Sequence, residues 1–406
     1  MKSSSLFIAH RSLLFLLCTL LPAPSLSQQK EFSQANATNL LHHLSVTIGP
    51  RPMGSPAERE ALQFAVEKFK ESGCDTGYIM PFTRTSSVNT NSGIAIGIKR
   101  GATNRIIVIG GHIDSADPEI PGADDDGSGT AIVIEASRVL CLTPKQSTYV
   151  FTCFGGEEQG LKGSSYFVEH FTEIQNVVLM LQADMANGLD VIDLMLETHS
   201  TSAPRWLVQA AVEEYYKLGY EQLRYASFFF SVNYALGSGV GSDHEPFLQW
   251  GIPAIDFTTK PDDPIHTPRD NFENFEQAGL KRSGDLVINL AERFDGGIPY
   301  RATEEYFLLL IGQTPVFFPI WSCWFFVLGT LFLVAFVIFR IRRTRLITAP
   351  SRRWTFLKML LFSFIIVCCS WFSSDVVGLL NGSRHAWFAN PEPFYLLSIL
   401  GAMLGL

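Results

Sequence analysis

The sequence predicts an α/β protein: a three-layer α/β/α domain with a mostly parallel central sheet, followed by C-terminal transmembrane helices. Three observations predict this architecture. Short, continuously apolar segments alternate with amphipathic segments between residues 56 and 294, as in a parallel sheet that is covered on both faces. Acidic and histidine-containing motifs follow several apolar segments, where open α/β sheets place their sites. Long apolar stretches without charge follow residue 300.

The N-terminus has the pattern of a signal peptide. Lys2 and Arg11 precede the apolar run 13–21, and prolines and small residues follow up to Ser27. That run is too short to span a bilayer. We therefore expect a cleaved signal peptide over residues 1–27 and an exported domain over residues 28–300.

The elements of this domain follow in order. Residues 31–44 are weakly helical. Ser55, Pro56 and Glu58 form a capping-box start for a helix that Gly73 ends. We then expect strands over residues 105–110, 148–154, 177–183, 191–197 and 253–257, and helices over residues 129–140, 160–171, 203–217 and 275–294.

The C-terminal region predicts membrane segments. Residues 316–339 contain no charge and are long enough to span a bilayer, residues 356–372 form a second span, and residues 394–406 form a partial one. The basic loop 340–355 between the spans is expected in the cytoplasm. The domain then lies on the other side of the membrane, in a periplasmic, extracellular or lumenal space, which agrees with the signal peptide.

Charge and cysteine content narrow the function. The net charge of −8 argues against nucleic acid as a partner. The exported domain has Cys74, Cys141 and Cys153, an odd number without metal spacing, so the sequence predicts no disulfide scaffold. Cys153 lies in an apolar strand and is expected in the core.

His112 and Asp114 form a His-x-Asp pair directly after the first buried strand. Such a pair can be an ordinary polar loop. As a metal site, His112 would be a ligand, and Asp114 would accept its other N–H and fix the tautomer.

Two further motifs are acidic. Residues 121–129 read PGADDDGSG, which is either a turn before the next helix or a metal loop; three adjacent carboxylates favour a cation. Glu157 and Glu158 follow two glycines after the second buried strand, and either cap a helix or place one carboxylate on a metal and the other near a reacting water.

Asp184 ends a third strand, and His266 lies in a proline-rich loop, where His244 competes for the same role. Each signal is weak alone. Together, His112, Asp125, Glu158, Asp184 and His266 supply two imidazoles and three carboxylates. Three carboxylates and one bridging hydroxide carry four negative charges, which balance the four positive charges of two Zn²⁺.

In this order the motifs resemble the co-catalytic zinc aminopeptidases related to bacterial leucyl aminopeptidase, aminopeptidase Y and glutamate carboxypeptidase, over about residues 40–295. The resemblance implies that Asp125 bridges two zinc ions and that Glu157 is the general base. One zinc would take His112 with Glu158 or Asp184, and the other His266 with the remaining carboxylate.

The same resemblance implies a cis peptide bond after Asp125. It also places Ser242, Asp243 and His244 along the site without making them ligands. Some relatives have a tyrosine shortly before this segment that stabilises the oxyanion. Residues 236–241 contain none, and Tyr234 is the nearest candidate.

The expected function is that of a zinc-dependent exopeptidase, foremost an aminopeptidase acting on peptides or small proteins with a free N-terminus. Phe228, Phe229, Phe230 and Tyr234 either line the pocket and favour an apolar first residue, or form a core strand. Two alternatives share the fold: carboxypeptidase or dipeptidase action, and glutaminyl cyclase chemistry with a single zinc. A third is a membrane-anchored binding module without catalysis.

Overall fold

A computed structural model describes residues 31–85, 89–189, 191–198, 201–225, 241–259 and 265–343, together with residues 357, 361 and 363–365. The predicted signal peptide 1–27 and the partial span 394–406 lie outside the described residues. The same is true of most of the predicted span 356–372, of the basic loop beyond residue 343, and of the aromatic residues 228–230 and 234.

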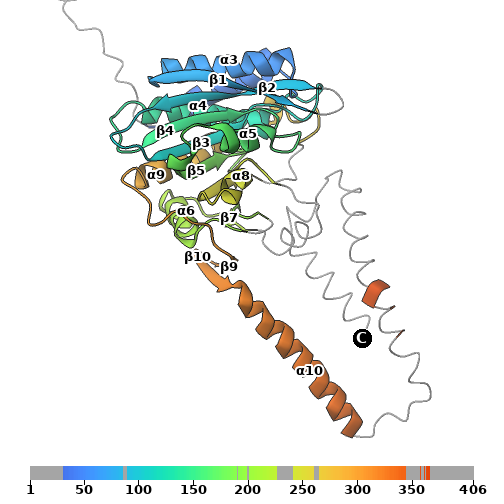
Figure 1. Ribbon diagram of the computed structural model, residues 1–406. Coiled ribbons are helices and arrows are strands. Elements are labelled where there is room, and N and C mark those ends of the chain that lie inside the picture. The colour runs from blue at the N-terminus through green and yellow to red at the C-terminus, as the bar shows by residue number, and fades with distance from the viewer. Residues whose placement is uncertain are drawn as a thin grey trace, which may run out of the picture. The chain divides into compact units, whose positions relative to one another are not determined.

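The centre of the domain is an eight-stranded sheet with the order β1-β2-β4-β3-β5-β8-β6-β7 (Figure 1). Four of its seven pairings are parallel and three are antiparallel. The strands are β1 (Thr76–Arg84), β2 (Thr90–Lys99), β3 (Ile106–His112), β4 (Thr148–Phe154), β5 (Val177–Ala183), β6 (Ile192–Met195), β7 (Leu223–Arg224) and β8 (Ala254–Thr258).

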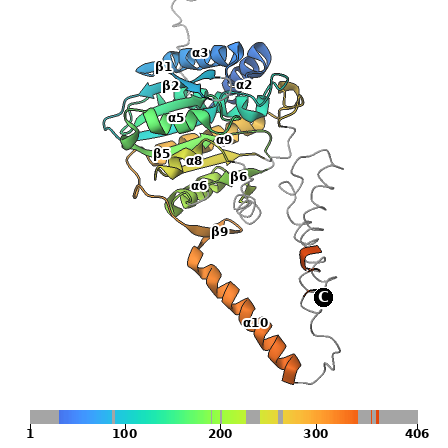
Figure 2. The ribbon, with the colours of Figure 1, turned by 45° about the vertical axis from the view of Figure 1, so that its right-hand side comes forward.

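Helices cover both faces of the sheet (Figure 2). One face carries α3 (Pro56–Glu71), α4 (Gly129–Leu140) and α9 (Ala278–Arg293), against which α2 (Gln34–His42) and α6 (Arg205–Lys217) pack. The other face carries α5 (Lys162–His170) and α8 (His244–Gln249). Short helical segments complete the domain at His43–Ile48, Ala123–Ser128, Ile174–Asn176 and Phe272–Asn274.

The central strands form the core. Every residue of β3, β4 and β8 is buried, as expected for strands that are covered on both faces. Helix α4 is buried on nearly all sides because it lies between the sheet and α2, α3 and α9. These apolar contacts fix the ends of three neighbouring strands, β4, β3 and β5, beside one another.

The start of α3 confirms the predicted cap in part. The Ser55 hydroxyl accepts a hydrogen bond from the main-chain N–H of Glu58 at 3.0 Å. The Glu58 carboxylate does not return to Ser55. It accepts from the main-chain N–H of Gly54 at 2.6 Å and from the Ser92 hydroxyl at 2.6 Å, because it is turned toward the sheet and buried.

The α/β architecture with a mostly parallel sheet is confirmed, and the predicted bounds of α4, β4 and β5 match the structure. Strands β1 and β2 were not predicted. Their glycines and mixed polarity hide the pattern: β1 is largely exposed, and Gly97 in β2 lies against the Phe69 ring, where an added Cβ would be 2.6 Å away.

The predicted transmembrane helix over residues 316–339 is wrong at its N-terminal end. Residues Thr314–Pro319 form strand β10, which pairs antiparallel with β9 (Tyr306–Ile311), and the helix α10 covers Cys323–Arg343 after a short turn at Ile320–Ser322. Pro315 and Pro319 disfavour helix there, and Gly312 supplies the positive φ of the hairpin turn. Within the part of the chain that the structure describes, no helix is both long and apolar enough to cross a membrane.

Candidate metal centre

The predicted site residues converge at the carboxyl ends of the three neighbouring strands. His112 is the last residue of β3, Glu157 and Glu158 follow β4, and Asp184 follows β5. Asp125 comes from the loop between β3 and α4, and His266 from the segment between β8 and α9. The topology therefore explains how residues spread over more than 150 positions meet at one edge of the sheet.

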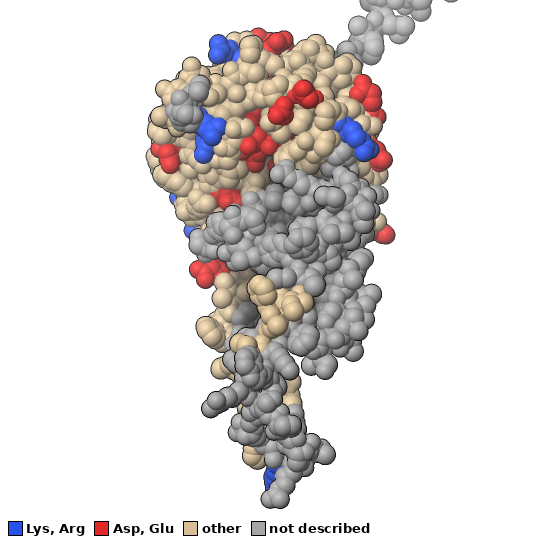
Figure 3. Space-filling model, turned by 90° about the vertical axis from the view of Figure 1, so that its right-hand side faces the viewer, with Lys and Arg blue, Asp and Glu red and all other residues tan. Residues whose placement is uncertain are grey.

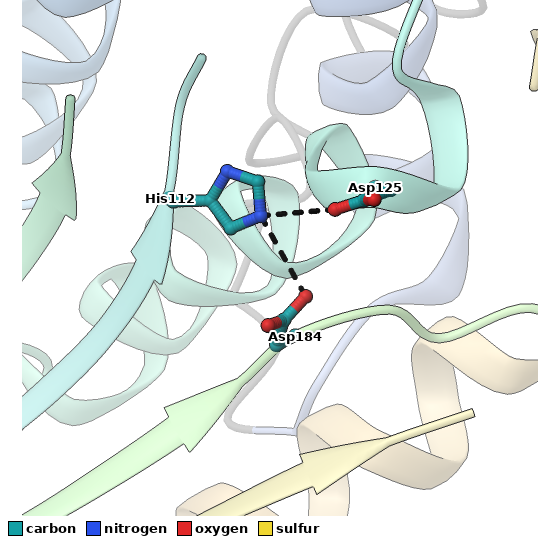
Figure 4. A group of neighbouring side chains, drawn as sticks. All are labelled: His112, Asp125 and Asp184. Carbon is teal, nitrogen blue, oxygen red and sulfur yellow. Dashed lines mark hydrogen bonds and ion pairs between the residues drawn. The ribbon is translucent and has the colours of Figure 1, made fainter. Parts of the chain in front are cut away.

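One set of ligand atoms, the inner group, consists of His112, Asp125 and Asp184 (Figure 4). The His112 Nε2 lies 3.0 Å from Asp125 Oδ1 and 3.7 Å from Asp184 Oδ1. All three side chains are buried. Figure 4 shows both carboxylates pointing toward the same imidazole nitrogen.

A second set, the outer group, consists of Asp125, Glu158 and His266. The His266 Nε2 lies 3.0 Å from Asp125 Oδ2 and 3.1 Å from Glu158 Oε2. Asp125 thus presents one oxygen to each histidine. The sequence left open which carboxylate accompanies which histidine, and the structure pairs Asp184 with His112 and Glu158 with His266.

The donor atoms fit metal ions. Ligand atoms around a tetrahedral zinc at 2.0–2.1 Å are about 3.3 Å apart, close to the distances in both groups. Among the described residues, the buried Asp184 Oδ1 and Glu158 Oε1 have no hydrogen-bond partner. Buried carboxylate oxygens normally have partners, so these two atoms favour a bound cation.

Electrostatics leads to the same conclusion. Burial, together with the nearby Asp125 carboxylate, raises the pKa of Glu158 to about 7, and burial raises the pKa of Asp184. Hydrogen bonds to Asp125 and Glu158 raise the pKa of His266 to about 10. The cluster therefore retains protons at neutral pH unless a cation replaces them. On the face that Figure 3 shows, acidic side chains lie both near the middle of the domain and at its edges, whereas basic ones lie toward the edges.

Asp114 contacts the site differently from the prediction. The His112 Nδ1 lies 3.1 Å from the main-chain carbonyl of Asp114 and 3.6 Å from its carboxylate. The carboxylate instead accepts from the main-chain N–H groups of Glu157, at 3.0 Å, and Glu158, at 3.3 Å. Asp114 thus orients the imidazole mainly through its carbonyl and positions both glutamates through its side chain.

The peptide bond between Asp125 and Asp126 is cis, as predicted. The Asp126 carboxylate points away from the ligand groups and accepts from the main-chain N–H of His112, at 2.9 Å, Gly129 and Met185. It therefore joins the end of β3 to the start of α4 and to the segment after β5. A Cβ on Gly129 would lie 2.0 Å from the Ala183 carbonyl oxygen, so this close packing requires glycine.

Sequence reasoning missed two residues that hold the metal loop. Asp270 accepts from the main-chain N–H groups of Asp124, at 2.7 Å, and Asp125, at 3.2 Å. The buried guanidinium of Arg51 donates to five main-chain carbonyls, those of Leu44, Gly49, Ile113, Pro121 and Gly122. The nearness of Asp270 to His266 was a usable signal, but nothing in the sequence around Arg51 indicates this role.

The segment that contains His244 lies beside the site without joining either group. The Ser242 hydroxyl donates to Asp184 Oδ2 at 2.5 Å and accepts from Gln182 at 2.6 Å. His244 is buried, and burial lowers the pKa of its imidazole to about 3. The structure therefore brings His266, not His244, to the other site residues.

Comparisons with known proteins agree with this geometry. Residues 94–291 match the model of Peptidase family M28. Aminopeptidase YwaD of Bacillus subtilis is 30% identical over 222 residues, which cover 51% of this chain and 44% of that protein. Leucine aminopeptidase 1 of Uncinocarpus reesii is 30% identical over 211 residues, which cover 47% of this chain and 52% of that protein. The chain spans about half the length of these curated relatives.

Solved structures show the same fold. A zinc aminopeptidase from Bacillus subtilis has a TM-score of 0.56 at 18% identity, over 66% of this chain and 96% of that one. A glutaminyl cyclase from Porphyromonas gingivalis has a TM-score of 0.54 at 20% identity, over 64% of this chain and 98% of that one. The fold is therefore shared with these solved structures. Over residues 94–291, just under half of the chain, the sequence is similar to peptidase family M28.

Proposed function

We propose that this chain is a zinc-dependent exopeptidase, specifically an aminopeptidase that binds two Zn²⁺ and removes N-terminal residues. The observation that carries the proposal is the pair of ligand groups, in which Asp125 offers one oxygen to each histidine. His112, Asp184 and Asp125 would hold one ion, and His266, Glu158 and Asp125 the other. When bound, the two ions would polarise the scissile carbonyl and acidify the attacking water.

Glu157 is the residue we assign as general base. It is adjacent in the chain to Glu158 but belongs to neither ligand group, and Asp114 fixes its main-chain N–H. Burial raises the pKa of Glu157 well above its ordinary value, against the opposing effect of His112. Its carboxylate can therefore take a proton from the attacking water and deliver it to the leaving amine.

The substrate class follows from the charge of the site. Three carboxylates besides the ligands, those of Asp114, Asp243 and Glu157, lie within electrostatic range of His112. A substrate's protonated α-amine would be attracted to such a site. We therefore infer peptides or small proteins with a free N-terminus as substrates. The aromatic residues 228–230 and 234 lie outside the described residues, so both sequence predictions for them stand: a pocket that favours an apolar first residue, or a core strand.

Hydrolysis of aminoacyl-nitroanilides by the zinc-loaded protein tests the proposal. We expect turnover of the free-amine substrate, none of its N-acetylated form, and two zinc ions per chain by elemental analysis. Glu157→Gln should lower kcat about 10²- to 10⁴-fold with zinc retained. The exposed Glu169→Gln is the matched control.

Other outcomes would identify the alternatives. Activity on N-blocked peptides with a free C-terminus would indicate a carboxypeptidase. Cyclisation of an N-terminal glutamine with one zinc per chain would indicate glutaminyl cyclase chemistry. A chain that binds no zinc and turns over none of these substrates would indicate a metal-free binding module.

We also propose that the C-terminal segment holds the domain at a membrane, with the domain on the extracytoplasmic side. Supporting this, one face of the β9–β10 hairpin exposes Phe307, Leu309 and Ile311, while Tyr306 and Leu308 face the core. Large apolar side chains remain exposed along the helix that follows, with Trp324 67% and Phe332 74% exposed. Exposed apolar surface of this extent is typical of a membrane contact.

Fractionation of cells that express the full chain tests this placement. The full chain should stay with membranes after alkaline carbonate washing, whereas a chain ending at residue 300 should be released. Protease added to intact vesicles should distinguish the two orientations of the domain. A full chain that washes off with carbonate would overturn the proposal.

A further inference from the structure

Two cysteines distant in the sequence meet in the structure. The sulfurs of Cys74 and Cys141 are 3.7 Å apart, although 67 residues separate them. Both side chains are partly exposed, whereas Cys153 is buried. Their pairing does not follow from the sequence, because three cysteines without regular spacing allow several pairs.

The main chain already places this pair for a bond. Gly73, at φ +93°, ends α3, and the N–H of Cys74 donates to the Phe69 carbonyl at 3.1 Å. Cys141 ends α4, and its N–H donates to the Ser137 carbonyl at 3.0 Å. The Sγ–Sγ distance of 3.7 Å exceeds the length of a disulfide bond, about 2.05 Å, by only about 1.7 Å, a gap that side-chain rotation can close.

The surroundings distinguish the two thiols. A hydrogen bond between them lowers the pKa of Cys141 and raises that of Cys74, and the ammonium of Lys99 lowers the pKa of Cys141 further. Lys99 is held beside the pair because its ammonium donates to the Gly73 carbonyl at 3.1 Å. Cys141 is thus the better nucleophile of the two.

We propose that Cys74 and Cys141 form a disulfide bond in the mature protein. The oxidant is a disulfide of the small-molecule or protein type, as found in oxidising compartments. The Cys141 thiolate attacks one sulfur of this disulfide and expels the other as a thiolate. Cys74 then loses its proton to that thiolate and attacks the Cys141 sulfur, which releases a second thiolate. Two protein thiols are oxidised, and one external disulfide is reduced to two thiols.

The position of the bond decides its effect. Helix α4 begins beside the metal loop and ends at Cys141, about 18 Å away for its 12 residues. The bridge therefore lies away from the ligand groups. It closes a loop of the chain that contains His112 and Asp125, so it restricts the unfolded chain without touching the catalytic residues.

Peptide mapping of the full chain tests the proposal directly. The protein is recovered from an oxidising compartment, denatured with N-ethylmaleimide present, and digested without reductant. We expect a linked pair of peptides containing Cys74 and Cys141, two hydrogen atoms lighter than their sum, with Cys153 alkylated. Alkylation of both Cys74 and Cys141 before any reduction would overturn it.

Stability gives a second, independent measurement. Cys74→Ser, Cys141→Ser and the double variant should each lower Tm by about 5–10 °C, and the double variant should be no worse than either single one. Reductant should lower the wild-type Tm to the same value and leave the variants unchanged. A wild-type Tm that does not change when reductant is added would contradict the proposed disulfide bond. Aminopeptidase activity below the transition should be the same in all forms.

Discussion

The inner and outer groups of the metal centre share Asp125 but are built differently. His112 and Asp184 lie at the ends of buried strands, and the Ser242 hydroxyl donates to Asp184 Oδ2. His266 lies in a loop, with 36% of its side chain exposed compared with 1% for His112. Its backbone has a positive φ of 56°.

In the proposed two-zinc site, one metal position belongs to the core and the other to the surface. The inner position is fixed by the same packing that fixes the sheet, so its geometry is set when the domain folds. The outer position depends on loop residues and is open to solvent. We therefore expect the outer ion to exchange more readily and to lie nearer the incoming substrate.

The largest effect should come from the residue that both groups share. Asp125→Ala removes one ligand atom from each group, so zinc content should fall from two per chain to below one. Hydrolysis should fall by at least about 10³-fold, because bound metal supplies several kcal/mol of transition-state stabilisation. Elemental analysis and kcat measure the two results. Two retained zinc ions would show that the groups do not depend on Asp125.

The two histidines provide the direct test of the comparison. His266→Ala should keep one tightly bound zinc, whereas His112→Ala should lose the inner ion. His112→Ala should also lower the unfolding free energy by about 1–3 kcal/mol, because it leaves the buried Asp125 Oδ1 without its imidazole partner. Zinc titration and thermal unfolding measure both variants. Equal losses of zinc and of unfolding free energy in the two variants would contradict the distinction between core and surface positions.

A smaller effect is expected from Asp114, which contacts both groups without being a ligand. Asp114→Asn weakens the hold on the main chain of Glu157 and Glu158 while leaving the carbonyl contact to His112. Changes to residues that orient ligands typically cost about 10- to 100-fold in metal affinity or activity. The exposed Asp117→Asn, in the same loop, is the control. An unchanged kcat and zinc affinity would refute the positioning role.

The smallest effect concerns pH and sharpens the picture of the outer group. Without metal, the pKa of Glu158 is about 7 against an ordinary 4.5, and that of His266 is about 10 against 6.5. The folded protein then binds more protons than the unfolded one. Its stability therefore falls as pH rises from 4.5 to about 7, through the titration of Glu158, and from 6.5 to about 10, through that of His266. We expect the Tm of the chelated protein to fall from pH 5 to pH 8. Zinc should raise Tm more at pH 8, because deprotonated ligands bind it better. A chelated Tm that rises over this range would contradict these shifts.

The sequence predicted the central strands because their burial on both faces makes them continuously apolar. β4 and β5 therefore have the predicted bounds, and the motifs that follow them mark the site. It could not assign Glu158 and Asp184 to their histidines, because that choice depends on side-chain directions across three strands. For the same reason, the sequence could not show that the Asp114 carboxylate accepts from the main chain of Glu157 and Glu158, while its carbonyl lies nearest to His112 Nδ1.

The apolar pattern misled at the C-terminal side. Residues 316–319 of β10 are mostly apolar, so the predicted helix 316–339 began within this strand. The prolines at both ends of β10 were the overlooked signal. Likewise, the role of Arg51 depends on five carbonyls from distant turns, which no local pattern encodes.

Arg51 has a consequence for how the protein acquires its metal. Its guanidinium and the Asp270 carboxylate satisfy the main chain of the segments around the ligand loop with protein groups alone. Folding and metallation are therefore separable, unlike in small zinc domains that fold only with their ion. With the proposed extracytoplasmic placement, newly made chains can fold first and bind zinc afterwards. The speed of activation would then be set by the local supply of zinc.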